Sequence, residues 1–137
     1  MHLQPYLMFD GRCEEAYEFY RNAVGAEAGM MMRYKDAPGS SEMTPPGSEN
    51  KIMHMEFRIG DSLVLASDGY CKGAPSFQGF NLVINAKDET EAKKLFAALS
   101  AGGEVRMPLD KTFFSPCFGM LADKFGVGWF VIVRPQA

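Results

Sequence analysis

Hydrophobic and polar positions follow two periods along this chain, and the same order of periods occurs twice. Residues 7–20 read LMFDGRCEEAYEFY, and residues 83–96 read VINAKDETEAKKLF. In each stretch a short apolar run is followed by an acidic turn, then Glu-Ala, then an apolar pair. Corresponding residues of the two stretches, such as Ala16 and Ala92, are 76 positions apart (92 − 16 = 76). Each stretch then passes a Gly-rich break into strand-like segments. This order indicates two copies of one β-α-β-β-β unit.

Apolar positions with helical spacing predict two helices, over residues 12–23 and 88–101. In the first helix they occur at i, i+3, i+4, i+7 and i+11, which are Cys13, Ala16, Tyr17, Tyr20 and Val24. Asp10 is the predicted N-cap of this helix, and Gly25 is predicted to end it. Asp88 is the predicted N-cap of the second helix, where Glu91 completes a capping box.

Eight strands are predicted from alternation and turn residues, over residues 4–9, 29–34, 52–59, 62–66, 80–85, 104–108, 118–122 and 129–133. The clearest alternation is in 52–59, where His54 and Glu56 share the face opposite Met55 and Phe57. We therefore predict an α+β fold of two βαβββ modules, which form a curved mixed sheet around a cleft.

The modules are predicted to belong to one domain over residues 1–137. The first spans residues 1–67 and the second 80–137, with a linker over 68–79. A long stretch over residues 36–50, rich in Pro, Gly and Ser, is predicted to be a mobile loop; as a functional loop it would be a lid.

Composition narrows the classes of partner. The net charge is −3 with no basic stripe, which argues against nucleic acid. No apolar run approaches the ~20 residues that a membrane-spanning helix needs, and the first residues do not resemble a signal peptide. Three cysteines without a C-x-x-C pair favour reduced thiols, so a cytoplasmic location is expected.

Three stretches in order resemble the vicinal oxygen chelate superfamily, which includes glyoxalase I, bleomycin-resistance proteins and extradiol dioxygenases. They are Pro5-Tyr6-Leu7 with Asp10-Gly11, Glu15-Ala16, Phe19-Tyr20 and Gly25; Met53-His54-Met55-Glu56-Phe57-Arg58-Ile59-Gly60; and Asp123-Lys124-Phe125-Gly126-Val127-Gly128-Trp129. The last two are similar to the PhnB-like branch. The resemblance implies the duplicated βαβββ fold and a homodimer.

The resemblance also implies four metal-ligand positions, two in each module, that normally carry His, Gln or Glu. Here they fall at Pro5 or Gln4, Leu65 or Val64, Phe80, and Phe130. Only Gln4 among these has a side chain that can coordinate a divalent cation. We therefore expect no metal quartet and no cofactor. Some members of the branch are named methyltransferases, but the sequence has no Gly-rich turn for a methyl-donor nucleotide.

Two functions remain open from the sequence. The first is binding of a small, largely apolar or aromatic molecule by the ligand-binding candidates Gln4, Tyr6, Leu65, Phe80, Phe114 and Phe130. The second is an enzyme of glyoxalase or dioxygenase type, metal-dependent or not, in which His54 and Glu56 are the catalytic candidates. Equally, His54 and Glu56 can be read as a solvated polar face. Cys13 and Trp129 are predicted to belong to the core.

Overall fold

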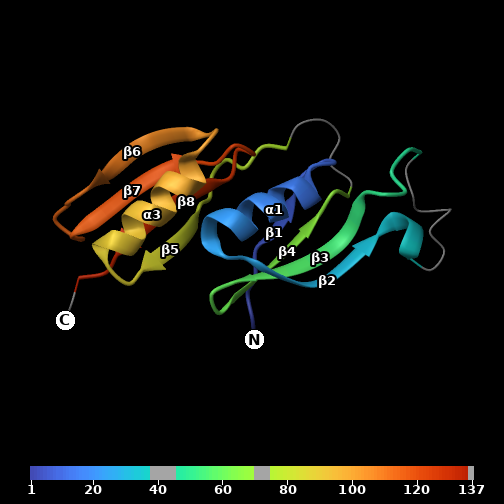
Figure 1. The fold of residues 1–137 in the computed structure, drawn as a ribbon, viewed down its shortest axis with the longest axis horizontal. Coiled ribbons are helices and arrows are strands. Elements are labelled where there is room, and N and C mark those ends of the chain that lie inside the picture. The colour runs from blue at the N-terminus through green and yellow to red at the C-terminus, as the bar shows by residue number, and fades with distance from the viewer. Residues whose placement is uncertain (38–45, 70–74, 136–137) are drawn as a thin grey trace. The chain divides into compact units, whose positions relative to one another are not determined.

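The computed structural model describes residues 1–37, 46–69 and 75–135 of the chain. It contains eight strands and two α-helices in this described part, arranged as two compact units, Met1–Pro75 and Ser76–Ala137 (Figure 1). Each unit is a βαβββ module, so the predicted α+β fold is confirmed. The predicted cleft and the predicted single domain remain predictions. Most of the predicted loop over 36–50 lies outside the described residues, at 38–45.

The first unit has a four-stranded mixed sheet in the order β1-β4-β3-β2. The strands are β1 (Tyr6–Met8), β2 (Glu27–Arg33), β3 (Ile52–Ile59) and β4 (Ser62–Ser67). β1 pairs with β4 in parallel, and the other pairs are antiparallel. A 3₁₀ turn, η1 (Tyr34–Asp36), follows β2. The turn at Gly60, whose φ is 59°, joins β3 and β4 as a hairpin.

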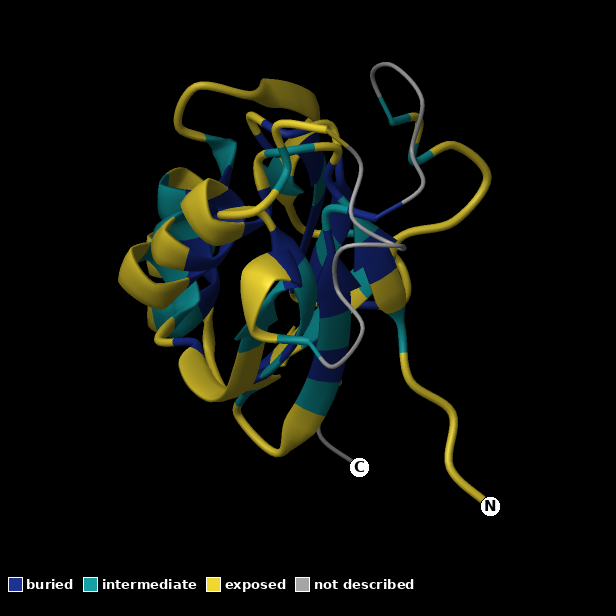
Figure 2. Ribbon diagram, turned by 90° about the vertical axis from the view of Figure 1, so that its right-hand side faces the viewer, coloured by how far each residue is buried: buried dark blue, intermediate teal, exposed yellow. Residues whose placement is uncertain are grey.

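Helix α1 (Cys13–Val24) covers one face of this sheet. Its buried stripe packs Tyr17 and Tyr20 against Phe57 of β3, with ring centroids 5.7 and 6.0 Å apart. Figure 2 shows the exposed outer surface of the helices and the buried strands beneath them. The side chains of Met55 and Phe57 are buried, as the alternation in 52–59 predicted.

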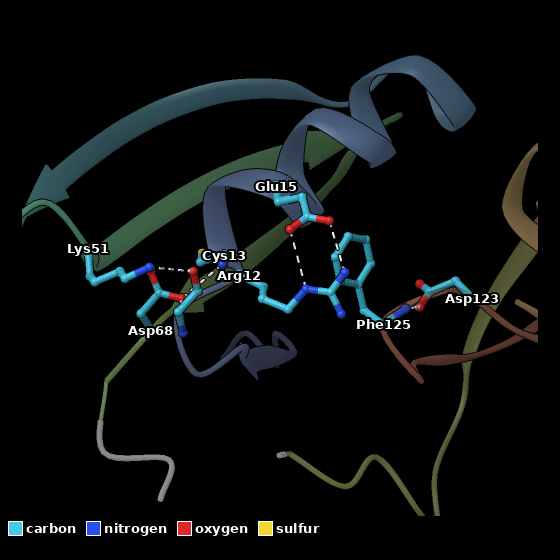
Figure 3. Close-up of polar contacts among 8 residues, drawn as sticks. Arg12, Cys13, Glu15, Lys51, Asp68, Asp123 and Phe125 are labelled. Atoms are coloured by element: carbon cyan, nitrogen blue, oxygen red, sulfur yellow. Dashed lines mark hydrogen bonds and ion pairs between the residues drawn. The ribbon is translucent and has the colours of Figure 1, made fainter. Parts of the chain in front are cut away.

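The start of α1 differs from the prediction, because Asp10 does not cap it. The N-cap is Arg12, which makes no capping hydrogen bond with its side chain. Instead, the carboxylate of Asp68 accepts hydrogen bonds from the N–H groups of Gly11 and Cys13, both at 2.8 Å (Figure 3). Its other oxygen accepts from Ile52 N at 2.9 Å. Asp10 instead occupies the tight turn into the helix, with φ at 46°.

The second unit repeats the same plan. Its sheet has the order β5-β8-β7-β6, and its strands are β5 (Leu82–Ala86), β6 (Glu104–Asp110), β7 (Cys117–Ala122) and β8 (Gly128–Val133). Helix α3 (Glu89–Ser100) has the predicted N-cap, since Asp88 accepts from Glu91 N at 2.8 Å. The Glu91 carboxylate accepts from Lys87 N, one residue before the cap.

A buried carboxylate organises the last hairpin. Asp123 is 3% exposed, and one of its oxygens accepts from the N–H groups of Phe125 and Val127. The other oxygen accepts from the indole Nε1 of Trp129 at 2.9 Å. Trp129 is 2% exposed, so its predicted place in the core is confirmed. These bonds satisfy a carboxylate that would otherwise be costly to bury.

Two findings complete the fold. The described helices include none long and apolar enough to cross a membrane. Phe80, predicted as the first residue of a strand, lies two residues before β5 and is 45% exposed. The chain bends at Gly79, where φ is 86°, and Phe80 lies in the irregular segment before the strand.

Candidate functional site

The face of the first sheet that α1 does not cover is here called the open face. Its side chains come from every second position of β1, β3 and β4: Tyr6, Met8, His54, Glu56, Arg58, Leu63, Leu65 and Ser67. The intervening residues Leu7, Met55, Phe57, Val64 and Ala66 are buried under the helix. The alternation of each strand therefore places polar side chains together with aliphatic ones on the open face.

Strand register brings residues from three strands into one lateral row. Tyr6 is the partner of Leu65 in the parallel pair, and Leu65 is the partner of Glu56 in the antiparallel pair. His54 lies on the same face two residues before Glu56. The first unit thus brings together four predicted site residues, which are Tyr6, Leu65, His54 and Glu56, while Gln4 is exposed in the segment before β1.

Tyr6 and His54 form the most specific contact on the open face. The Tyr6 hydroxyl lies 2.8 Å from Nδ1 of His54, and the two rings are 5.5 Å apart and tilted by 43°. β4 separates the two strands, so the tyrosine reaches across that strand to meet the imidazole. The buried Ser67 lies on this strand and presents only a small side chain, whose hydroxyl donates to Met53 O.

Partial burial raises the pKa of Tyr6 above its usual value. The hydroxyl therefore keeps its proton throughout the physiological range. A neutral phenol beside an imidazole can donate a hydrogen bond, or pass a proton between ligand and ring.

A shallow cavity of about 340 Å³ lies farther along the same face. Its lining consists of Glu27, Ala28, Gly29, Met30, Glu56, Arg58 and Leu63. The cavity lies beside a bulge in β2, where the register shifts between Ala28 and Met31. The side chains of Glu56 and Arg58 have no hydrogen-bond or ion-pair partner among the described residues, so both are available to a ligand.

The superfamily's metal positions do not form a metal site with these side chains. Leu65 lies on the open face and Val64 is buried beneath it. Phe80 lies in the irregular segment before β5, and Phe130 is on β8. Within residues 1–37, 46–69 and 75–135, no group of three or more His, Cys, Asp or Glu residues could hold a metal ion. Hydrocarbon and phenyl groups do not replace the water ligands of a divalent cation.

The second unit gathers a different set of predicted residues. Phe114 and Phe130 both pack against Phe118, with centroids 5.0 and 5.5 Å apart. Phe130 is the register partner of Val83 and Met120. Phe80 contacts Phe77, at 6.5 Å. Phe114, Phe118 and Phe130 therefore form an aromatic cluster, and the exposed Phe113 contacts Phe114 with ring centroids 5.2 Å apart.

Sequence reasoning missed several residues of these sites. Arg58 continues the alternation of His54 and Glu56, so the pattern itself could have included it. Met30 lines the cavity because of the bulge in β2, and Leu63 lines it because β4 pairs with β3. Neither of these can be read from a single segment.

The two described cysteines are poor candidates for chemistry. Cys13 and Cys117 are 1% and 3% exposed. Burial is the main cause that raises the pKa of each thiol. A raised pKa opposes the thiolate that a nucleophile requires, so Cys13 has the structural role that the sequence predicted.

Comparison with known proteins gives a family match over nearly the whole chain. A model of the family described as 3-demethylubiquinone-9 3-methyltransferase matches residues 1–132. The chain is 36% identical over 143 residues to Protein YjdN of Escherichia coli (strain K12), covering 99% of this chain and 97% of that protein.

Solved structures agree with this match. Protein PA1353 from Pseudomonas aeruginosa has a TM-score of 0.86 and 34% identity, with 99% of both chains covered. A putative 3-demethylubiquinone-9 3-methyltransferase, PhnB protein, from Bacillus cereus has a TM-score of 0.82 and 29% identity, covering 98% of this chain and 100% of that one. A glyoxylase/bleomycin resistance protein/dioxygenase domain from Frankia sp. EAN1pec, at 12% identity and a TM-score of 0.68 over 98% of both chains, shares the fold.

Proposed function

We propose that this chain, which belongs to the family described as 3-demethylubiquinone-9 3-methyltransferase, is a small-molecule binding protein. The family is a PhnB-like branch of the vicinal oxygen chelate superfamily. Its ligand is largely apolar or aromatic and carries a few polar atoms. The ligand lies on the open face of the first sheet, without the metal quartet that is usual in the superfamily.

The observation that supports this proposal most directly is the composition of the open face. A hydrogen-bonded Tyr6–His54 pair lies on it, with Leu65 and Glu56 in the same lateral row as Tyr6 and a cavity of about 340 Å³ farther along. Aliphatic walls with a few convergent polar groups are typical of small-ligand sites. Burial of apolar ligand surface contributes roughly 25 cal/mol per Å², and the polar groups orient the ligand.

Methyl transfer is not part of this proposal. A methyl-donor nucleotide is typically held by a Gly-rich turn at the start of a helix. At α1 the Asp68 carboxylate already accepts from the N–H groups of Gly11 and Cys13. At α3 Asp88 caps the first turn. The chain's own carboxylates therefore occupy N–H groups at both helix starts, and neither start has a Gly-rich turn.

A second candidate function is catalysis by the same residues. The Tyr6–His54 contact favours it, because a phenol hydrogen-bonded to an imidazole can move a proton to or from a bound substrate. Glu56, on the same face, would be the orienting or accepting carboxylate. This alternative uses the same site as the binding function.

A fragment screen by ¹H–¹⁵N NMR, with aromatic and alkyl fragments, tests the binding function. We expect hits to shift signals of the open face in the native protein. We expect His54→Ala to lose these shifts while its stability changes by less than about 1 kcal/mol. The matched control is His2→Ala, since His2 is exposed in the segment before β1.

Elemental analysis of protein purified without chelators tests the absence of the metal quartet. The proposal predicts no stoichiometric Zn, Ni, Mn or Fe. About one metal per subunit, lost in Glu56→Gln, would contradict it and favour the catalytic alternative. Hits that map away from the open face would contradict the site.

A further inference from the structure

The contact between Tyr6 and His54 has two possible directions. The hydroxyl can donate to Nδ1 of the ring, or a protonated Nδ1 can donate to the hydroxyl oxygen. The direction decides which ring nitrogen carries the proton of a neutral imidazole, and therefore what the other nitrogen, Nε2, offers to a ligand. A donor at Nε2 and an acceptor at Nε2 select opposite kinds of ligand atom.

The chemistry of the two groups favours donation by the tyrosine. A phenol is the stronger acid and its oxygen a weak base, whereas a neutral imidazole nitrogen is a good acceptor. The raised pKa of Tyr6, caused mainly by its burial, keeps the phenolic proton in place. A side-chain hydrogen bond with Ser67 acts against this rise, and the Ser67 hydroxyl also donates to Met53 O at 2.6 Å.

The open face supplies a complementary acceptor. Glu56 lies two residues from His54 on the same face of β3, and its carboxylate has no hydrogen-bond or ion-pair partner among the described residues. The charged residues that line the adjoining cavity are Glu27, Glu56 and Arg58, with a formal sum of −1 (1 − 2 = −1). This net negative charge would therefore repel an anionic ligand, whereas it would not repel a neutral carbonyl compound.

We propose that Tyr6 is a positioning residue whose hydroxyl fixes His54 as the Nε2–H tautomer, so that the site selects a neutral carbonyl compound. The carbonyl oxygen accepts from Nε2–H, and an N–H or O–H beside it donates to Glu56. This inference rests on the proposed function for its ligand, but the tautomer is a property of the protein alone.

The tautomer is tested first, without ligand. Long-range ¹H–¹⁵N NMR of the imidazole signals is recorded at about pH 8.5, where a free imidazole with a pKa of about 6.5 is neutral. The chain has 2 histidines, so His2 is an internal reference. We expect His54 to be the Nε2–H tautomer in the native protein and to become a mixture in Tyr6→Phe.

The control for this first experiment is Met8→Leu, which changes the same strand and face without removing a hydroxyl. We expect it to leave the His54 signals unchanged. An Nδ1–H tautomer in the native protein would overturn the inference. So would His54 signals that do not respond to Tyr6→Phe in a variant whose amide spectrum shows native folding.

The ligand class is tested with two probes, benzamide and benzylamine, each titrated to millimolar concentration. Benzamide has both a carbonyl oxygen and an N–H, whereas benzylamine has only a cationic donor. We expect benzamide to shift the Nε2 signal of His54 and to bind about 2- to 10-fold more weakly to Tyr6→Phe, as loss of one positioned hydrogen bond implies.

Two results would overturn the ligand class: an effect of benzylamine on His54 without one of benzamide, or an equal effect of the two probes. Failure of the proposed binding function is a different result, because it would remove both probe effects and leave the tautomer of the free protein as predicted.

Discussion

At the scale of single residues, two aspartates accept hydrogen bonds from N–H groups at helix starts, one from a neighbouring position and one from a distant position in the sequence. Asp88 caps α3 from the position directly before the helix. Asp68 satisfies N–H groups at the start of α1 from the end of β4, 55 residues away from Cys13 in sequence. The local cap was predictable from the sequence, because Asp88 and Glu91 have capping-box spacing. The distant one was not, because only strand pairing brings Asp68 to the helix.

Replacing Asp68 should therefore be costly. We expect Asp68→Ala to lower the free energy of unfolding by about 2–4 kcal/mol, since it leaves the N–H groups of Gly11, Cys13 and Ile52 without their acceptor. Urea unfolding measures the change. Asp61→Ala is the control, because Asp61 is an exposed turn residue with no hydrogen-bond partner among the described residues. A loss equal to that of the control would refute the role of Asp68.

The candidate site was only partly predictable at this scale. Alternation in β3 correctly placed His54 and Glu56 on the face opposite the core. The contact of His54 with Tyr6 joins residues 48 apart in sequence and crosses an intervening strand, so no local pattern contains it. Phe80 was misplaced because the predicted strand began too early. Element boundaries are the least reliable part of a prediction from one sequence, and the apolar Phe80 extends the pattern of the strand that follows it.

At the scale of elements, close packing between α3 and its sheet depends on a glycine. A Cβ on Gly119 of β7 would lie 2.7 Å from Phe96 Cε2 and 3.1 Å from Leu109 N. We expect Gly119→Ala to destabilise the fold by about 1–3 kcal/mol through overpacking. The control is Gly29→Ala in β2, where the nearest atom would be Glu56 O at 3.7 Å. Thermal and urea unfolding of both variants measure the change. Equal stability of Gly119→Ala and Gly29→Ala would show that β7 can shift to accommodate the added Cβ.

An ion pair ties α1 to β2. Arg33 donates to both oxygens of Glu14, at 3.1 and 2.8 Å, and lowers the pKa of that carboxyl by hydrogen bonding. A lowered pKa stabilises the fold above the unfolded value of about 4.3, and this contribution is lost as the pH falls through the lower folded value. Both side chains are partly exposed, so the gain is at most about 1 kcal/mol.

We therefore expect Arg33→Met to be less stable than the native protein at pH 7 by at most about 1 kcal/mol. The difference should shrink toward zero below the folded pKa of Glu14, in urea unfolding followed against pH. Arg21→Met is the control, because the Arg21–Glu18 pair is a single contact between two side chains that are both about half exposed. A difference that stays constant with pH would mean that Arg33 acts only through its bond to Asn50 O.

At the scale of the whole molecule, the order of elements was the most predictable property. All eight strands and both helices occur where the repeat predicted them, with ends that differ by up to two residues. The helices keep the offset of 76 (89 − 13 = 76). Such ends depend on pairing partners rather than on local sequence, so single segments define them least well. The arrangement of the two modules cannot be derived from patterns within either module.

Apolar surface remains on both units. Large side chains that are at least a third exposed include Met30 and Met31 in the first unit, and Val83, Val105, Met107 and Phe113 in the second. Surface of this kind commonly marks an interface, so we expect a homodimer. Sedimentation equilibrium at micromolar concentration should give about 30 kDa, twice the chain mass of 15.2 kDa. A single 15 kDa species would contradict this expectation.

The two ways of capping also imply an order of events during folding. The cap of α3 lies within its own sequence, so this helix can begin to form while the rest of the chain is unfolded. The cap of α1 exists only after β4 has closed a loop of more than 50 residues, and closing such a loop has an entropic cost. We therefore expect the transition state for folding to contain the Asp88 bond, with a φ-value near 0.5 or more for Asp88→Ala. The Asp68 bonds should form later and give a φ-value near 0. The two copies of the unit would then fold one after the other, because Asp88 is next to the helix that it caps and Asp68 is far from its helix along the chain.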